Sequence, residues 1–135
     1  MTPIRIVIVE DNPADVTLIK MALDESSIPF TLTRFPDGAA AVQDLCRNRP
    51  QEVPDAILLD LNTPKMDGFE VLEHLRRTPW MESVPVAIIT SSRARIDRQA
   101  AAGRNVRYVE KRAQLEEFFT SIVELVKEML PDRQL

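Results

Sequence analysis

The chain has 135 residues, of which 44% are hydrophobic, and its net charge is −4. This is the size of one ordinary domain with a single substantial core, so we expect one domain over residues 1–135. The acidic balance argues against general binding to nucleic acid or to an anionic membrane, since both favour clustered positive charge. One cysteine, Cys46, cannot form an internal disulfide, and the first apolar run is too short for a signal peptide or a membrane span. We therefore expect a cytoplasmic protein.

Five short apolar runs recur along the chain, each of strand length, at residues 4–9, 31–35, 56–59, 86–89 and 106–109. Three of them (IRIVIV, AILL and VAII) are nearly continuous apolar stretches, which is typical of strands that are covered on both faces. Segments with helical periodicity lie between the runs. The order predicts an α/β fold, doubly wound, with a parallel sheet and right-handed crossovers.

Local signals mark where the helices begin. Asn12 can accept backbone N–H groups as an N-cap, and Pro13 fits the first helical position because no donor is needed there. A helix is therefore predicted from residue 13. The Asp-Gly pairs at 37–38 and 67–68 predict turns that enter the second and third helices, and Gly103 is expected to allow a tight turn before the last strand.

The last helix, predicted over residues 113–130, has an unusually wide apolar face. At 100° per residue its apolar side chains cover roughly 160°, more than the stripe of about 100° that packing on one sheet face requires. Part of this face is therefore expected to meet a partner molecule.

Chemically reactive side chains follow four of the five predicted strands. Glu10 and Asp11 come after the first strand, Asp60 after the third, Thr90 ends the fourth and Lys111 follows the fifth. Ligand sites of open parallel sheets form just beyond the carboxyl ends of the strands, so these side chains should lie close together. Three neighbouring carboxylates repel one another, and a lysine and a divalent cation would offset that repulsion. Because the ligands are all hard oxygens, Mg²⁺ is the expected ion.

The same residues suggest a reaction. A carboxylate such as Asp60 can attack phosphorus to give an aspartyl phosphate, and this transfer depends on charge neutralisation and alignment. Mg²⁺ and the ammonium group of Lys111 would neutralise the phosphoryl oxygens, while the hydroxyl of Thr90 would donate a hydrogen bond to them.

Four segments in this order resemble the two-component response-regulator receiver domains: VEDN, LLDLNTPKMDGFEVL, AIITSS and YVEK. The resemblance covers about residues 4–130. It implies a flavodoxin-like fold of five parallel strands in the order 2-1-3-4-5 with five helices.

The resemblance also implies roles for individual residues. Asp60 would be the phosphoacceptor. Asp11 and Asp60 would bind Mg²⁺ directly, Glu10 mostly through water, and the main-chain carbonyl of Asn62 would complete the protein ligands. Two further residues match the switch pair of the family, namely Thr90 and Tyr108.

Because the resemblance takes up nearly all of the 135 residues, the chain is expected to be a stand-alone response regulator without an effector domain. It would accept the phosphoryl group from a histidine kinase or a phosphotransfer protein of a two-component or phosphorelay system, and would signal through protein contacts. It would not be an enzyme, although it would promote its own phosphotransfer and dephosphorylation. EDNPADV, the TSS string and a lysine not followed by proline are similar to regulators that serve phytochrome-type histidine kinases. Most receivers have proline after a cis bond where this chain has Arg112, so the geometry of the Lys111–Arg112 bond is left open.

Two other functions compete with this interpretation. An Mg²⁺-dependent phosphatase of the haloacid dehalogenase type also uses an aspartate nucleophile, but it requires Asp-x-Asp, and Asn62 stands at the second of these positions. A pseudo-receiver that only binds partners would be expected to lack the acceptor, the acidic pair or the lysine, and the chain has all of them.

Surface charge and the wide apolar face together predict a two-fold homodimer through the fourth helix, the fifth strand and the fifth helix. Its apolar centre would be formed by Val123, Leu125 and Leu130. Its charged contacts would join arginines of one copy, namely Arg93, Arg95, Arg98, Arg104 and Arg107, to glutamates of the other, namely Glu116, Glu117, Glu124 and Glu128.

Overall fold

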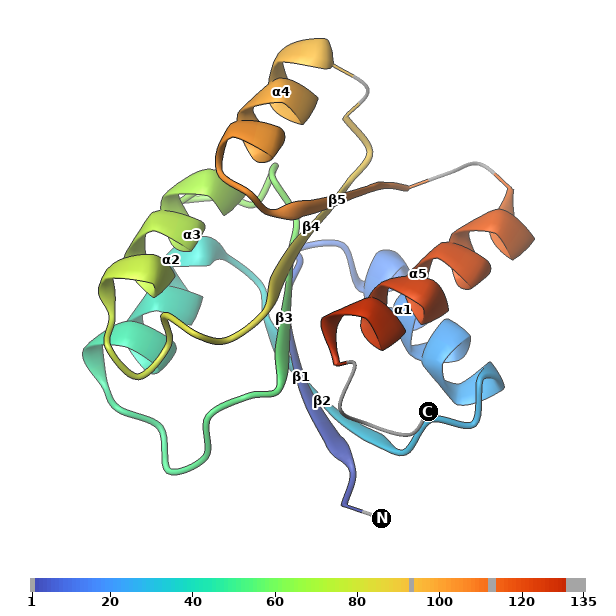
Figure 1. Cartoon of the computed structure of the whole chain (residues 1–135), viewed down its shortest axis with the longest axis horizontal. Helices are drawn as coiled ribbons and strands as arrows, with labels where there is room; N and C mark the ends of the chain where they lie inside the picture. Colours follow the sequence, from blue (N-terminus) through green and yellow to red (C-terminus); the bar gives the residue numbers. More distant parts are fainter. Residues whose placement is uncertain (1, 93, 112–113, 131–135) are drawn as a thin grey trace.

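A five-stranded parallel sheet runs through the centre of the molecule (Figure 1). The computed structural model describes residues 2–92, 94–111 and 114–130. The strand order is β2-β1-β3-β4-β5, which confirms the predicted order. The predicted strands differ from the observed ones by at most one residue at each end. The strands are β1 (Ile4–Val9), β2 (Phe30–Phe35), β3 (Ala56–Leu59), β4 (Val86–Thr90) and β5 (Arg107–Glu110).

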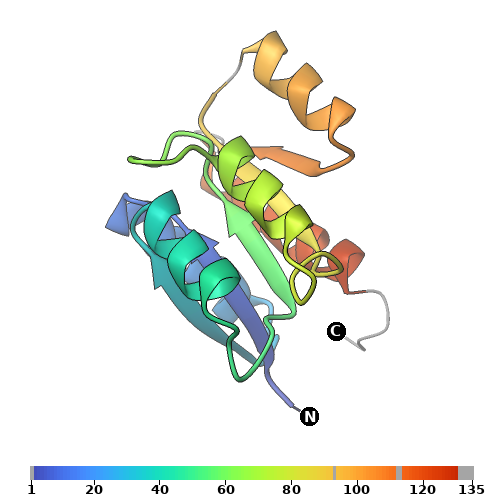
Figure 2. The same cartoon turned by 90° about the vertical axis from the view of Figure 1, so that its left-hand side faces the viewer.

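Helices cover both faces of this sheet. In Figure 1, α1 and α5 lie on one side of the strands and α2 and α3 on the other, while α4 lies next to β5. Figure 2 shows α2 and α3 side by side in front of the sheet. The helices are α1 (Pro13–Glu25), α2 (Gly38–Val42), which continues as the π-helical turn η1 (Gln43–Arg47), α3 (Gly68–Arg77), α4 (Arg95–Gly103) and α5 (Leu115–Met129).

The predicted starts of the first three helices are confirmed. Asn12, Asp37 and Asp67 are N-caps whose side chains accept backbone N–H groups at 2.9, 2.7 and 3.0 Å. Each cap satisfies a donor that has no partner within the helix. Pro13 occupies the first turn of α1, as expected.

The inner strand β1, which lies between β2 and β3, separates two hydrophobic cores. Ile4, Ile6 and Ile8 pack in the core that α1 and α5 close, whereas Val7 and Val9 pack in the core beneath α2 and α3. Successive side chains of a strand point to opposite faces, so a strand covered on both sides must be apolar throughout. This explains the continuous apolar run in the sequence.

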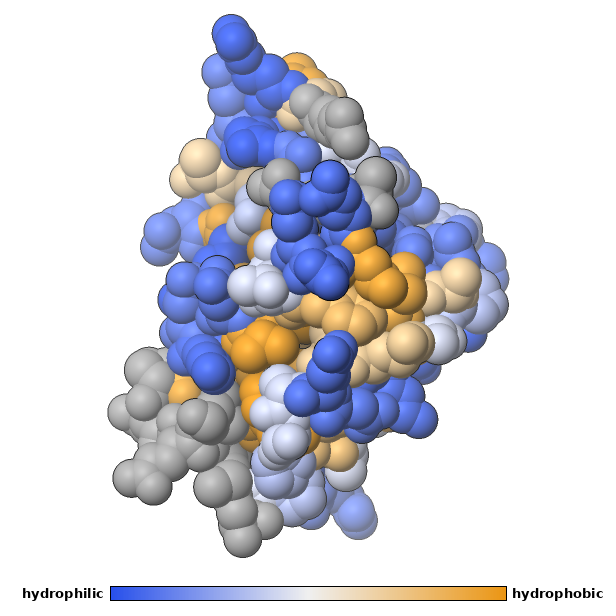
Figure 3. All heavy atoms as spheres, turned by 90° about the vertical axis from the view of Figure 1, so that its right-hand side faces the viewer, coloured by the Kyte–Doolittle hydropathy of each residue, from blue (hydrophilic) through white to orange (hydrophobic). Residues whose placement is uncertain are grey.

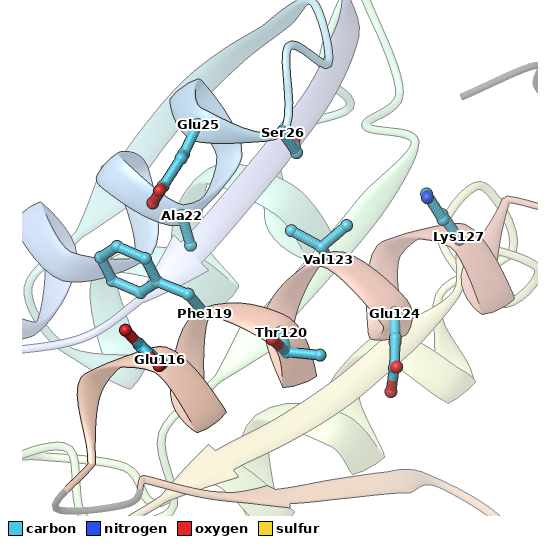
Figure 4. A pocket seen from close by; sticks show the side chains of 9 residues that line it. All are labelled: Ala22, Glu25, Ser26, Glu116, Phe119, Thr120, Val123, Glu124 and Lys127. Carbon is cyan, nitrogen blue, oxygen red and sulfur yellow. The ribbon is translucent and has the colours of Figure 1, made fainter.

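The width of the apolar face of α5 has a cause within the chain. Its buried residues face the sheet, and Leu125 among them is only 4% exposed. Phe119 and Val123 turn toward α1, where they line a shallow groove with Ala22 (Figure 4). Packing against two neighbours, the sheet and α1, therefore accounts for the width of the apolar face of α5. The prediction that Leu125 closes an apolar centre between two copies is wrong, because that side chain is already buried.

The turn before β5 also differs from the prediction. Gly103 is the last residue of α4, and its φ is not positive. The left-handed position is Asn105, with φ 53°. Asparagine is one of the few residues other than glycine that adopt this conformation readily, so it serves the turn that we assigned to Gly103.

Two predicted features lie outside the described residues, namely the contact of Arg93 and the start of the last helix at residue 113. The Lys111–Arg112 bond, whose geometry the sequence left open, lies outside them too. Within the described ranges, none of the helices has the length and apolar character that crossing a membrane requires.

Candidate metal centre at the carboxyl edge of the sheet

Three carboxylates meet where β1 and β3 end. The two strands pair in parallel with Val9 opposite Leu59, so the residues that follow, Glu10 and Asp60, leave the sheet at the same level. One oxygen each of Glu10, Asp11 and Asp60 lies within 4.8 Å of the others. Glu10 and Asp60 are almost fully buried, and like charges so close together are unfavourable without a cation. The all-oxygen donor set fits a hard divalent ion.

Lys111 reaches into this cluster from the end of β5. Its backbone N–H donates to the Thr90 carbonyl at 2.7 Å, which continues the pairing of β5 with β4. Its Nζ donates to Glu10 Oε1 at 2.5 Å and to Asp60 Oδ2 at 3.2 Å. A third bond, to Asp15 Oδ2 at 2.8 Å, was not predicted. The structure thus brings Lys111 together with the carboxylates, as expected, and adds a fourth carboxylate.

The burial of the cluster changes its ionisation. Burial raises the pKa of Glu10 from 4.5 to about 7, the neighbouring Asp60 raises it too, and the hydrogen bond from Lys111 opposes them. Burial alone would lower the pKa of Lys111, but the hydrogen bonds to Asp15 and Glu10 outweigh it and raise the pKa above its ordinary value. Lys111 is therefore a fixed cation. Glu10 takes up a proton near neutral pH in the absence of metal, and a bound cation would displace that proton.

The loop after β3 holds Asp60 in place from the other side. The backbone N–H of Asn62 donates to Asp60 Oδ1 at 3.2 Å, and its side-chain Nδ2 donates to Thr90 Oγ1 at 3.4 Å. Gly68 packs so tightly on this loop that a Cβ there would lie 2.9 Å from the Asp60 carbonyl oxygen. The role of the Asn62 main-chain carbonyl as a ligand stays a prediction.

Thr90 and Tyr108 are linked through a residue that the sequence did not single out. Thr90 is fully buried, and its Oγ1 accepts a hydrogen bond from the backbone N–H of Ser92 at 3.2 Å. The Tyr108 hydroxyl donates to the Ser92 carbonyl at 3.0 Å. The Arg98 guanidinium lies 5.5 Å from the centre of the Tyr108 ring and forms an ion pair with Glu110. A continuous path therefore runs from the metal centre to the surface of α4.

Two further side chains contact the site without having been predicted. Arg34 donates from Nε to the Glu10 carbonyl and from Nη2 to the Asp11 carbonyl, both at 2.9 Å. It can do so because it pairs with Ile8 across the sheet, just before the acidic pair. Arg34 is the one charged residue of β2 (FTLTRF), and this charge was the signal in the sequence that could have identified it. For Asp15 the signal was its place in the first turn of α1, directly after the acidic pair.

Residues 6–123 match the family of response regulator receiver domains, and the chain belongs to this family. It is 36% identical to the response regulator Rcp1 of Synechocystis sp. over 126 residues, which are 89% of this chain and 84% of that protein. The crystal structure of the phosphorylated cyanobacterial phytochrome response regulator RcpA superposes with a TM-score of 0.84, 32% identity and 99% coverage of both chains. The Mn²⁺-bound form of Rcp1 superposes with a TM-score of 0.82 and 33% identity, over 98% of this chain and 99% of that one.

These similarities confirm the predicted family, fold and likeness to phytochrome-associated regulators. Receiver domains act in two-component signalling with histidine kinases or phosphotransfer proteins, and they bind a divalent metal ion. The roles of Asp60, Thr90 and Lys111 in this chain stay predictions, which the geometry now makes specific.

Proposed function

We propose that the chain is a phosphorylation switch that accepts a phosphoryl group on Asp60, in the presence of Mg²⁺, and signals through contacts of its surface. The observation that carries the proposal is the environment of Asp60. Asp60 is only 7% exposed as a residue. Its Oδ2 accepts from the Lys111 ammonium and its Oδ1 from the Asn62 backbone N–H, and two more carboxylates that could bind a metal lie beside it. A nucleophile held from both sides is aligned before its substrate arrives.

The chain's own residues have distinct tasks in this transfer. An Asp60 oxygen attacks the phosphorus of a phosphohistidine or a small acyl phosphate, forming the new P–O bond as the bond to the leaving group breaks. The Lys111 ammonium and the Thr90 hydroxyl donate hydrogen bonds to the phosphoryl oxygens. A cation held by Glu10, Asp11 and Asp60 would neutralise the remaining charge on those oxygens.

Mg²⁺ is our choice of ion. The solved form of Rcp1 contains Mn²⁺, and both ions prefer carboxylate, carbonyl and water ligands. The donor set of this chain contains no thiolate or imidazole, which would favour zinc. The cytoplasm is the compartment that we propose for this chemistry. We regard the chain as a phosphoacceptor and not as an enzyme, because the phosphoryl group stays on the chain until hydrolysis.

The phosphoryl donor that we propose is a phytochrome-type histidine kinase or its phosphotransfer protein. The support is the similarity to RcpA, which is a phytochrome response regulator. Phosphotransfer from a panel of autophosphorylated kinases tests this choice, and faster transfer from an unrelated kinase than from every phytochrome-type kinase would contradict it.

We retain a homodimer through α4, β5 and α5 as a proposal, with different contacts. Ile96 on α4 is 74% exposed, so it replaces Leu125 as the apolar contact. Two of the arginines expected to meet a second copy already form ion pairs within the chain, Arg98 with Glu110 and Arg107 with Glu128. Exposed ion pairs contribute only about 0–1 kcal/mol, so they would set the register of two copies more than their affinity.

Mass spectrometry tests the main proposal. Incubation with Mg²⁺ and acetyl phosphate should add one phosphoryl group to the wild type and none to Asp60→Asn. Asp67→Asn is the matched control, since Asp67 lies in the same loop region and serves as the N-cap of α3. An adduct that persists in Asp60→Asn would show that another nucleophile reacts. A wild type that takes up no phosphoryl group would favour a pseudo-receiver that only binds partners.

A further inference from the structure

Asp15 contacts Lys111 but lies apart from the metal-binding carboxylates. Its Oδ2 is 2.8 Å from the Lys111 Nζ, closer than the Asp60 oxygen at 3.2 Å. The clustered oxygens that could hold a metal come from Glu10, Asp11 and Asp60, and Asp15 is not among them. Its side chain is 25% exposed, compared with 2% for Glu10 and 8% for Asp60.

A lysine ammonium has three N–H donors, and the three carboxylates use all of them. Two of the acceptors, Glu10 and Asp60, are also needed by the metal ion. Asp60 must in addition turn an oxygen toward phosphorus during the transfer. Asp15 is therefore the acceptor that stays free to hold Lys111 when the other two are engaged.

Without Asp15, Lys111 would depend on Glu10 and Asp60 alone. Its positive charge would then compete directly with the cation for the same oxygens. It would also lose the restraint that keeps Nζ beside Asp60, and a displacement of about 1 Å is enough to slow a positioned reaction substantially.

We propose that Asp15 is a positioning residue that acts through Lys111: it anchors the ammonium group beside Asp60 and limits its competition with the metal ion. The inference rests on the proposed phosphoacceptor function and deepens it. It gives the first turn of α1 a part in setting the rate of phosphorylation.

The contact itself is tested in the metal-free protein. The ammonium group of Lys111 should give a nitrogen-15 signal that is protected from solvent exchange, because three acceptors hold it. Asp15→Asn should weaken that protection, while Asp24→Asn, an exposed carboxylate later on the same helix, should leave it unchanged. Equal protection in wild type and Asp15→Asn would overturn the proposal.

The function of the contact is tested by a double-mutant cycle with Lys111→Ala. Loss of one charge-assisted hydrogen bond should slow Asp60 phosphorylation by phosphoramidate about tenfold in Asp15→Asn and weaken Mg²⁺ binding measured by calorimetry. Asp15→Glu should restore part of both. In the Lys111→Ala background, Asp15→Asn should change neither the rate nor the Mg²⁺ affinity further.

Each other outcome has a definite meaning. An equal loss of Mg²⁺ affinity in both backgrounds would show that Asp15 acts on the cation through space, which overturns a role through Lys111. A wild-type rate and affinity in Asp15→Asn would overturn any role. If no variant, including the wild type, is phosphorylated, the proposed function fails, while the Mg²⁺ cycle still decides whether Asp15 and Lys111 are coupled. Asp15→Ser replaces the asparagine variant if that protein does not fold.

Discussion

The buried carboxylate of Glu10 makes the stability of the metal-free protein fall as the pH rises. Its pKa is about 7 in the folded chain, against an ordinary value of 4.5, so the folded state binds more protons than the unfolded state between these values. The free energy of unfolding must then decrease with pH across that window. From pH 5 to pH 8 the expected decrease is about 2–3 kcal/mol, since one pKa unit corresponds to about 1.4 kcal/mol.

Urea unfolding measures this decrease directly. Trp80 is the single tryptophan and its Nε1 donates to the Leu45 carbonyl at 2.8 Å, so its fluorescence reports loss of the packed state. The comparison with Glu10→Gln isolates Glu10, because every other titrating group is common to both proteins. The variant should lack this pH-dependent decrease.

Mg²⁺ supplies a second comparison. The ion requires the ionised carboxylate, so saturating Mg²⁺ should stabilise the wild type more at pH 8 than at pH 5. A wild type whose stability rises between pH 5 and 7 in parallel with Glu10→Gln would refute the reasoning, because Glu10 would then not hold the extra proton.

Three further changes test other parts of the structure. Lys111→Met leaves the buried carboxylates uncompensated, so it should lower the free energy of unfolding by about 3–5 kcal/mol at pH 8 without metal and by less with Mg²⁺. Urea unfolding curves that shift equally with and without Mg²⁺ would argue against this. Gly38→Ala places a Cβ 2.2 Å from the Met66 carbonyl oxygen, and overpacking of this kind costs roughly 1–3 kcal/mol, so Tm should fall by several degrees. An unchanged Tm would mean that the backbone around Met66 moves aside at little cost. Ile96→Ser should weaken self-association in light scattering without changing Tm, and a wild type that stays monomeric at high micromolar concentration, with and without beryllofluoride, would end the dimer proposal.

Sequence patterns were informative where structure is decided locally. Asn12 and Asp37 cap helices with their own side chains, so a few neighbouring residues suffice to predict those starts. The apolar strand β1 reveals its burial on both faces because each face requires every second side chain to be apolar. Its boundaries were therefore predicted correctly.

Patterns were insufficient where the identity of the neighbour matters. The sequence shows that the apolar face of α5 is wide, but periodicity does not show that α1 packs beside the part with Phe119 and Val123. At the site, strand ends predicted which carboxylates gather. They did not predict Arg34 or Asp15, because those contacts depend on side-chain reach from β2 and α1 toward atoms fixed by other elements.

The path from Thr90 to Tyr108 makes the proposed switch testable without phosphorylation. If Thr90 turns its hydroxyl toward a phosphoryl oxygen, it weakens the bond that it accepts from the Ser92 N–H, and the Ser92 carbonyl is the acceptor for Tyr108. Tyr108→Phe removes the far end of this path and should free the segment between β4 and α4. A switch that biases two existing states would then move amide signals of α4 in the unmodified variant partway toward their positions in the beryllofluoride-bound wild type. Signals that stay at the unmodified wild-type positions would show that the Tyr108 hydroxyl does not restrain the switch.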